Sequence, residues 1–386
     1  MQTPSPPQLR SLQHISPSLY ASARSCGARA GWAVFGKNGD FPETPAALLG
    51  RAFHITMGRA AVEGQHGSTS EIQSVSRNVF NVAANELHSK AHPLLRAKFP
   101  RTELLPYYYL VRERVALAAL EVANVPALST HGPTSAAGVQ QRRAVEKRLR
   151  SSDGLLVGQP DLVEAPQREV FDYKTNLGPQ GMPDAVSDAE TSQLRLYAYL
   201  LQENGVAIER GTIVRANGTR LSVPISEDDA RKEADAARQT LTEFNRSVSA
   251  GGDFGTLARP SAEVCKWCPC LPMCEPFWQA AQPEWAPVCG SHVEGTVLEV
   301  EESNLLGTPL VSLVVQARRG TCGIGNKTIE QIPQVWLTAG GSSVPRPSDV
   351  VRAVHVRIGQ PDAESIKVDR MSSAVWTAPG DTGGSV

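Results

Sequence analysis

The chain of 386 residues contains no apolar run approaching the roughly 18 residues that a membrane-spanning helix needs. Its first residues, MQTPSPPQLRS, also lack the apolar core of a secretory signal peptide. We therefore expect a cytoplasmic protein with no membrane partner. The abundance of Ala, Arg and Gly favours a GC-rich, prokaryotic genome as its source.

A strong net charge of either sign is absent as well. The formal net charge is −1, so a nucleic-acid partner would have to be held by a local basic groove. The sequence has no Walker A phosphate loop, which means that any helicase acting with this chain would be a separate protein. With 41% hydrophobic and 20% charged residues, the chain has the composition of a soluble globular protein.

The length exceeds what one hydrophobic core usually fills, so two domains are expected. Helix-like and strand-like patterns both occur within residues 13–284, the first expected domain. Residues 290–378 hold five strand-like runs, including IPQVWLTA at 332–339, and are most like a small all-β, OB-like barrel. The Pro- and Ser-rich residues 1–12 and the tail 379–386 are expected to be disordered.

Four helices follow from local patterns. Apolar residues recur with helical spacing at 45–63 and at 105–123. Ser187 and Glu190 form a capping-box pattern that predicts the start of a third helix. Residues 226–248 begin with a capping serine and predict a fourth helix, which is largely polar on its outer face.

Three charged residues lie in one predicted hairpin, GQPDLVEAPQREVFDYKTN. Its first strand is predicted at 154–163, and VFDYK pairs back after a turn at EAPQRE. Residues two apart on a strand point the same way, so Asp172 and Lys174 share a face while their aromatic neighbours pack on the other. Asp161 then lies near the end of the neighbouring strand, close to Asp172.

Two carboxylates at that distance repel each other, and a hard divalent cation relieves the repulsion. Mg²⁺ uses few protein carboxylates and keeps several waters, which suits a catalytic site. A metal ion eases the deprotonation of such a water and offsets charge on a phosphate. Lys174 could orient the water or stabilise the phosphate. The alternative is an exposed hairpin with three solvated charges, since the pattern is short.

The seven cysteines favour a metal site over a disulfide framework, because a reducing cytosol keeps thiols free. Four of them are clustered: Cys265, Cys268, Cys270 and Cys274. Those four could bind zinc as a compact knuckle. Alternatively, the distant Cys26 replaces Cys270 among the ligands, around a 4Fe-4S cluster. Cys289 and Cys322 have no partners by spacing and are expected to be ordinary buried thiols.

The charged hairpin has the pattern of the PD-(D/E)xK nuclease superfamily, and its surroundings resemble the RecB-like branch. Four further elements of that branch have counterparts here, in the same order. HISPSLYASARSC (14–26) is similar to its SPS…C opening, and LLGRAFH (48–54) is similar to its histidine-bearing helix. QLRLY (193–197) is similar to its Q-x-x-x-Y helix, and Cys265, Cys268 and Cys274 are similar to its C-x-x-C-x5-C ending. The resemblance covers about residues 13–280. It extends to CRISPR-associated RecB-type exonucleases and AddB-type nuclease domains. For residues 13–284 it implies an α/β, restriction-endonuclease-like core in which helices flank a mixed sheet.

The resemblance also implies roles for individual residues. The implied ligands of Mg²⁺ or Mn²⁺ are Asp161, Asp172, His54 and the backbone carbonyl of Tyr173. Lys174 would be the catalytic lysine. Gln193 and Tyr197 are four residues apart and so share a helical face; they would border the site and contact the nucleic-acid backbone. The alternatives are a core histidine at position 54, ordinary helix packing at 193 and 197, and a solvated charge for Glu146, which precedes the first strand.

For the cysteines, the resemblance favours the iron–sulfur ligand set, Cys26, Cys265, Cys268 and Cys274. Cys26 falls where the RecB-like branch keeps its lone first cysteine. A cluster held in this way would join the N-terminus to the C-terminal end of the nuclease domain. Because it would close a loop of more than 200 residues, metal binding should be strongly coupled to folding.

A basic segment is a candidate for substrate contact. Residues 86–150 carry 11 Lys or Arg against 5 Asp or Glu and include Tyr107–Tyr109. Basic residues with interleaved aromatics suit single-stranded nucleic acid; the alternative is a basic helical face with buried tyrosines. Residues 290–386 have no such excess of positive charge, and their possible contacts are Trp336 and Arg318–Arg319.

Together these features predict a Mg²⁺- or Mn²⁺-dependent deoxyribonuclease with a 4Fe-4S cluster. It would hydrolyse phosphodiester bonds of single-stranded DNA with a metal-activated water, as an exonuclease in DNA repair or antiviral (phage) defence, alongside a separate helicase or defence-complex partner. The alternative function is a non-catalytic, DNA-binding scaffold subunit of such a complex. The intact set of Asp161, Asp172 and Lys174 argues against the scaffold.

Overall fold

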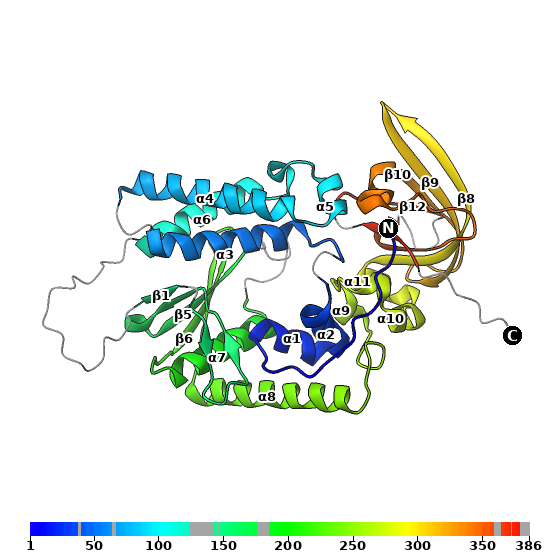
Figure 1. Cartoon of the computed structure of the whole chain (residues 1–386). Coiled ribbons are helices and arrows are strands. Elements are labelled where there is room, and N and C mark those ends of the chain that lie inside the picture. The colour runs from blue at the N-terminus through cyan, green and yellow to red at the C-terminus, as the bar shows by residue number, and fades with distance from the viewer. Residues whose placement is uncertain are drawn as a thin grey trace, which may run out of the picture.

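The computed structural model describes residues 1–37, 40–63, 67–123, 143–145, 147–175, 185–358, 364–371 and 373–378. Within these ranges a central mixed sheet lies between two layers of helices, and a strand-rich region follows it (Figure 1). No helix in the described part of the chain is both long and apolar enough to cross a membrane.

The central sheet has the strand order β1-β4-β5-β6-β7. Its strands are β1 (Arg143–Val145), β4 (Leu162–Glu164), β5 (Glu169–Lys174), β6 (Arg210–Arg215) and β7 (Arg220–Pro224). β5 and β6 run parallel, and the other neighbours pair antiparallel. The prediction of an α/β domain with a mixed sheet flanked by helices is therefore confirmed.

One face of the sheet is covered by α7 (Asp188–Glu203) and α8 (Glu227–Ser249). Val163, Val170 and Ile213 of the sheet share one buried apolar cluster with residues of these two helices. In Figure 1 both helices lie below the sheet, and α8 forms the lower edge of the molecule. This shared apolar cluster packs α7 against β5.

The opposite face is covered by α3 (Pro45–Glu63), α4 (Thr69–Ser89) and α6 (Tyr108–Ala123). Phe171 and Tyr173 of β5 pack into this second cluster, as strand alternation predicts. α3 and α6 confirm two of the helices expected from apolar spacing. The spacing did not identify α4, a long helix that begins at a capping box.

The predicted helix caps are confirmed. Ser187 Oγ accepts a hydrogen bond from the Glu190 N–H, and the Glu190 carboxylate accepts one from the Ser187 N–H, so the first turn of α7 has its donors satisfied. Ser226 Oγ accepts from the Asp229 N–H at the start of α8. These short-range signals fix where the two helices begin.

The single strand predicted over 154–163 is wrong, because the segment divides into two. β3 (Val157–Gly158) pairs with β2 (Leu149–Arg150) in a separate small sheet, and the chain then enters β4. Pro160 lies at the division, and proline has no N–H to donate to a ladder. Asp161 consequently stands just before β4.

The C-terminal region has its own apolar core and the strand order β12-β10-β9-β8-β11-β13. Its strands are β8 (Ser291–Leu305), β9 (Thr308–Gly320), β10 (Gly325–Pro333), β11 (Val350–Ile358), β12 (Ser365–Lys367) and β13 (Ala374–Thr377). β12 pairs with both β10 and β11. The strand predicted at 332–339 is wrong: β10 ends at Pro333, which cannot extend the ladder, and helix α12 (Gln334–Leu337) follows.

The N-terminal segment 1–12 is not the disordered tail that its composition predicted. Met1 is buried, and its carbonyl accepts a hydrogen bond of 2.6 Å from the Thr377 N–H, so the N-terminus lies against β13. The Leu12 N–H donates to Asn245 Oδ1 on α8 at 2.7 Å. Buried Met1 and Leu12 supply the apolar contacts that a simple count of prolines and serines overlooks. The tail 379–386 lies outside the described residues.

A buried ion-pair network joins the C-terminal strands to the cysteine-rich segment. Arg352 on β11 donates to Glu294 Oε2 at 2.6 Å and to the Pro272 carbonyl at 2.8 Å. The side chains of Arg352 and Glu294 are only 5% and 4% exposed. Glu275 pairs with Arg352 from the same segment as Pro272. Removing one member of such a network leaves another charge buried without its partner.

Arg352→Ala should therefore lower the free energy of unfolding by about 3 kcal/mol. Arg357→Ala is the matched control: Arg357 lies on the same strand, is 72% exposed and, among the described residues, pairs with Asp369, so its effect should stay below about 1 kcal/mol. Urea unfolding of both variants measures the difference. Equal unfolding midpoints for the two variants would contradict a stabilising role for the network.

Candidate active site

Asp161, Asp172 and Lys174 meet at the edge of the central sheet. β4 and β5 pair with Leu162 opposite Phe171, so the residue before β4, Asp161, arrives beside Asp172. Because side chains alternate along a strand, Asp172 and Lys174 both point to the α7 side of the sheet. The register of this hairpin alone is therefore enough to bring the three charged residues together, as predicted.

Helix α7 places two polar side chains against these charges. Lys174 Nζ donates to Gln193 Oε1 at 2.8 Å and lies 2.7 Å from Asp172 Oδ2. Gln193 Nε2 donates to Asp172 Oδ1 at 2.6 Å and to the Tyr197 hydroxyl at 3.0 Å. Gln193 therefore holds the lysine and the carboxylate in one fixed geometry, and Tyr197 supports it from the next turn of the helix.

The second carboxylate is oriented from the other side. Asp161 Oδ2 accepts a hydrogen bond of 2.6 Å from the backbone N–H of Tyr173, and Asp161 Oδ1 lies 3.1 Å from His54 Nδ1. His54 projects from α3 and is partly exposed. The structure thus places His54 at the site and not in the core.

The predicted side chains line one cavity of about 450 Å³. Its described lining is Ala46, Ala47, His54, Gln159, Asp161, Asp172, Tyr173, Lys174, Thr175, Gln193 and Tyr197. The sequence interpretation did not single out Gln159 or Thr175. Each stands next to a predicted site residue, since Gln159 is two positions before Asp161 and Thr175 follows Lys174 directly.

The environment of Asp172 favours its protonated form in the metal-free protein. Burial raises the pKa of Asp172 to about 7, and the negative charge of Asp161 acts in the same direction. The positive charges of Lys174 and His54 oppose this rise without cancelling it. Ionisation of Asp172 is therefore unfavourable in the metal-free site, and a bound cation would favour the ionised form.

This pKa predicts how stability depends on pH. The unfolded carboxyl titrates near 3.8 and the folded one near 7, so the folded state binds the proton more tightly. The stability that Asp172 contributes is then present at low pH and is lost as the pH rises from about 4 through about 7. In EDTA, the melting temperature of the wild type should fall between about pH 5 and about pH 8 by more than that of Asp172→Asn. A parallel change in both proteins would contradict the raised pKa.

The donor set of this cavity fits a hard divalent cation. Two carboxylates and a histidine nitrogen are ligands that Mg²⁺ and Mn²⁺ accept. Asp172 Oδ2 is buried and, although the Lys174 ammonium is near, it accepts no well-directed hydrogen bond. As the described side chains stand, no three His, Cys, Asp or Glu residues are arranged to hold a metal ion, here or at the cysteines. In this cavity Lys174 and His54 pair with the two carboxylates. The Tyr173 carbonyl as a ligand stays a prediction.

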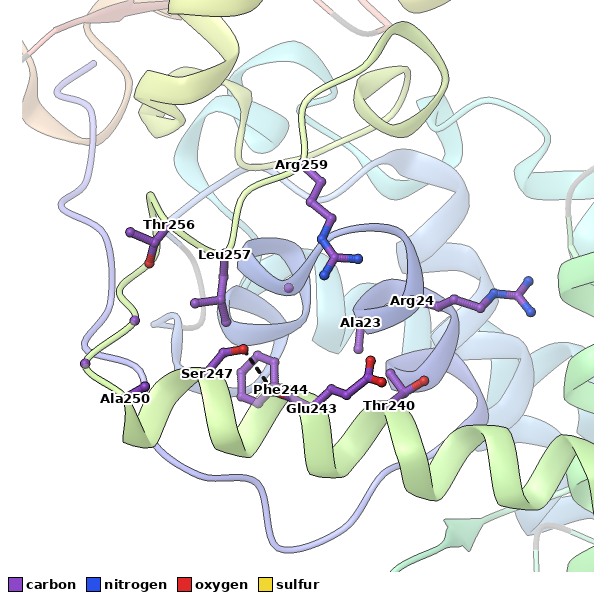
Figure 2. A pocket seen from close by; sticks show the side chains of 13 residues that line it. Ala23, Arg24, Thr240, Glu243, Phe244, Ser247, Ala250, Thr256, Leu257 and Arg259 are labelled. Carbon is purple, nitrogen blue, oxygen red and sulfur yellow. Dashed lines mark hydrogen bonds between the residues drawn. The ribbon is translucent and has the colours of Figure 1, made fainter.

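A second cavity, of about 540 Å³, lies between α8 and the helix pair α1 (Pro17–Ser25) and α2 (Gly27–Phe35) (Figure 2). The charged side chains that line it are Arg24, Glu243 and Arg259. With one carboxylate and two guanidinium groups, the charged lining of this cavity is net positive, which disfavours a divalent cation. The cavity at Asp161 and Asp172 is therefore the candidate active site.

The fold brings Cys26 to the distant cysteine-rich segment. Cys26 separates α1 from α2, and the segment runs between α9 (Ala262–Cys265) and α10 (Glu275–Ala280). Cys26 and the four clustered cysteines share one buried cluster, and Figure 1 shows α2 beside α9. The seven cysteines are free thiols.

The thiols are close enough to influence one another's ionisation. Burial raises the pKa of Cys265 and of Cys274 to about 12, and the charges of Cys268 and Cys26 add to the rise. A hydrogen bond with Cys270 lowers the pKa of Cys268 to about 7. No three of the described cysteines are arranged as the ligands of a metal ion, so a thiolate-ligated centre at this cluster stays a prediction.

Two cysteines outside the favoured set also lie at this cluster. Cys270 contacts Cys268, so the zinc ligand set and the iron–sulfur set both remain open. Cys289 raises the pKa of Cys265 through its charge, although burial is the main cause. The expectation that Cys289 has no partner was based on spacing alone, and the fold places it near Cys265.

The predicted substrate contacts are only partly accessible. Tyr108 is buried and donates to Asn81 Oδ1 at 2.7 Å, whereas Tyr107 and Tyr109 are exposed. In the C-terminal region Arg319 pairs with Glu275 and Glu294, which gives it a structural role. Much of the basic segment, including residues 124–142 and position 146, lies outside the described residues.

A family model described as the PD-(D/E)XK nuclease superfamily matches residues 14–275 of the chain. That match includes both aspartates, Lys174, α7 and the cysteine-rich segment. No curated protein shows a significant sequence match to the chain.

Proposed function

Because the chain belongs to the PD-(D/E)XK nuclease superfamily, we propose that it is a Mg²⁺- or Mn²⁺-dependent deoxyribonuclease that degrades single-stranded DNA as an exonuclease. One observation carries the proposal: Asp161 and Asp172 face each other at the sheet edge, with Lys174 fixed beside Asp172 by Gln193. A merely solvated hairpin has no reason to bury Asp172 or to tie Lys174 to α7.

Asp161 and Asp172 would hold the cation, with His54 as a further ligand. When bound, such an ion lowers the pKa of a water and offsets negative charge on a phosphate. Lys174 Nζ, held by Gln193 Oε1, can donate a hydrogen bond to the attacking water or to a phosphate oxygen as its charge develops. Gln193 Nε2 fixes Asp172 Oδ1, so the orientation of this carboxylate does not depend on the substrate.

The RecB-like branch and its 4Fe-4S cluster belong to the proposal. The burial of Cys26 together with Cys265, Cys268 and Cys274 supports a centre that joins the two ends of the nuclease domain. A zinc site that uses Cys270 is the alternative, and the contact between Cys268 and Cys270 keeps it open.

We propose that the C-terminal strands form an OB-like barrel. The strand order β8-β9-β10-β12-β11, with β11 again beside β8, gives each of these five strands two neighbours. The parallel pairing of β10 with β12 and the short α12 between β10 and β11 also support this topology. Barrels of this kind commonly bind single-stranded nucleic acid. The proposed setting is the prokaryotic cytoplasm, in repair or antiviral defence with a separate helicase or defence-complex partner.

The test uses purified protein and single-stranded oligonucleotides labelled at the 5′ or the 3′ end. We expect digestion from one end with Mg²⁺ or Mn²⁺ and none in EDTA. A circular single strand should resist digestion, and its cleavage would contradict the exonuclease assignment. Linear DNA left intact with either metal would contradict the nuclease proposal itself, and an RNA of the same sequence tests the preference for DNA.

A further inference from the structure

A third cavity, of about 450 Å³, opens where the nuclease domain meets the C-terminal strands. We call it the aromatic groove, and its aromatic and basic lining residues are Trp32, Phe41, Trp267, Trp376, His355, Lys37 and Lys98. Ala47, in the first turn of α3, lines both this groove and the candidate active site. The two cavities are therefore neighbours that share a wall.

Trp267 offers a flat apolar surface at the mouth of the groove. Its side chain is 66% exposed, which is unusual for the largest apolar residue. It stacks on His355 with ring centroids 5.7 Å apart and planes 22° from parallel. His355 lies at a register shift in β11 and has a φ of 51°, a conformation that residues other than glycine rarely adopt. Bulges and unfavourable backbone angles of this kind recur beside functional sites.

One buried polar group in the groove has no hydrogen-bond partner among the described residues. The Trp376 indole N–H is buried and finds no hydrogen-bond acceptor among the described residues. Lys37 is exposed at the groove, whereas Lys98 is buried and donates to the Ser373 carbonyl. The groove thus combines the exposed ring of Trp267, a buried donor and an exposed lysine.

We propose that the aromatic groove binds unpaired bases of the DNA strand whose backbone enters the active site. The inference rests on the proposed function: the active site would hold the backbone of a DNA strand. The neighbouring groove, which shares the wall at Ala47, would hold bases of the same strand. Bases carry ring faces that can stack on Trp267 and acceptor atoms that can meet the Trp376 N–H. Lys37 would face a phosphate between them. Bases in a duplex are already stacked and paired, so this groove selects single strands.

The test measures binding in EDTA, where the strand is not cut, by fluorescence anisotropy of a labelled single-stranded oligonucleotide. Trp267→Ala should weaken binding roughly tenfold, whereas Trp267→Phe, which keeps a stacking ring, should remain close to the wild type. Binding of the matched duplex should be the same for all three proteins. Metal content and circular dichroism check that the neighbouring cysteine cluster is intact.

Lys37→Glu provides a second test remote from the cysteines. It should weaken single-strand binding. The slope of the logarithm of the binding constant against the logarithm of the salt concentration should become shallower by about 0.7, as expected for the loss of one phosphate contact. Lys232→Glu, an exposed lysine on α8, is the matched control and should leave both quantities unchanged. Unaltered single-strand binding by Trp267→Ala, or equal weakening on duplex, overturns the proposal.

The outcomes separate this proposal from the nuclease assignment, because cleavage is measured independently with wild type and metal. If the wild type digests DNA but Trp267→Ala binds single strands as tightly as the wild type, only the groove proposal is overturned. Binding that depends on Trp267 without any digestion supports the groove and overturns the nuclease function. A wild type that does not bind single strands in EDTA overturns the groove as well.

Discussion

If the proposed function is correct, Asp172→Ala should reduce DNA cleavage at least about 10³-fold, because it removes a proposed cation ligand and releases Lys174 and Gln193 together. A metal ion stabilises the transition state by several kcal/mol, and each 1.36 kcal/mol corresponds to about tenfold in rate. In the structure Asp172 contacts both Lys174 and Gln193, so a neighbouring water cannot restore the arrangement. Initial rates on a labelled single strand with Mg²⁺ measure the loss.

The same substitution should leave the protein folded. Since Asp172 is a buried group whose charged form is unfavourable, its removal should not lower the melting temperature in EDTA near neutral pH. Glu169→Gln is the matched control, because Glu169 begins the same strand and pairs with Arg210 away from the site. It should retain wild-type activity. Residual cleavage above about one tenth by Asp172→Ala, or equal losses in both variants, would place the chemistry elsewhere.

The site could be predicted because it depends on short-range geometry. Alternation along a strand puts Asp172 and Lys174 on one side, and a four-residue spacing puts Gln193 and Tyr197 on one helical face. The structure brings these side chains together with Asp161, as the sequence indicated. What the sequence could not supply is the environment: the burial that raises the pKa of Asp172 depends on how α7 packs on the sheet.

The errors share a different cause, which is tertiary context. The Tyr107–Tyr109 run is uniform in sequence, yet packing against Asn81 buries only its middle member. The segment 1–12 is rich in Pro and Ser, yet Met1 and Thr3 bond to Thr377 of β13 and Leu12 bonds to Asn245 of α8. The aromatic groove depends on His355 reaching Trp267 across the domain boundary. No local pattern records such contacts between distant parts of the chain.

Cys26→Ala should remove the proposed metal centre and lower the stability of the nuclease domain more than any other cysteine substitution. A link between Cys26 and Cys265 closes a loop of about 240 residues, and a cross-link of that span contributes about 5 kcal/mol in the chain-entropy account. Iron and zinc analysis of protein purified without oxygen, followed by thermal melting, measures both effects. The melting temperature should fall because α1 and α2 lose their attachment to the C-terminal end of the domain.

The ligand set is decided by comparing Cys26→Ala with Cys270→Ala, since both thiols are buried in one cluster and only one belongs to each candidate set. An iron–sulfur centre requires that Cys270→Ala retains iron while Cys26→Ala loses it. The reverse result, with zinc in the wild type, would assign the compact zinc knuckle instead. Cys322→Ala controls for the removal of a buried thiol, because Cys322 lies in the core of the C-terminal strands. Equal metal content in all variants would mean that these thiols hold no metal, and the long loop would then be closed by packing alone.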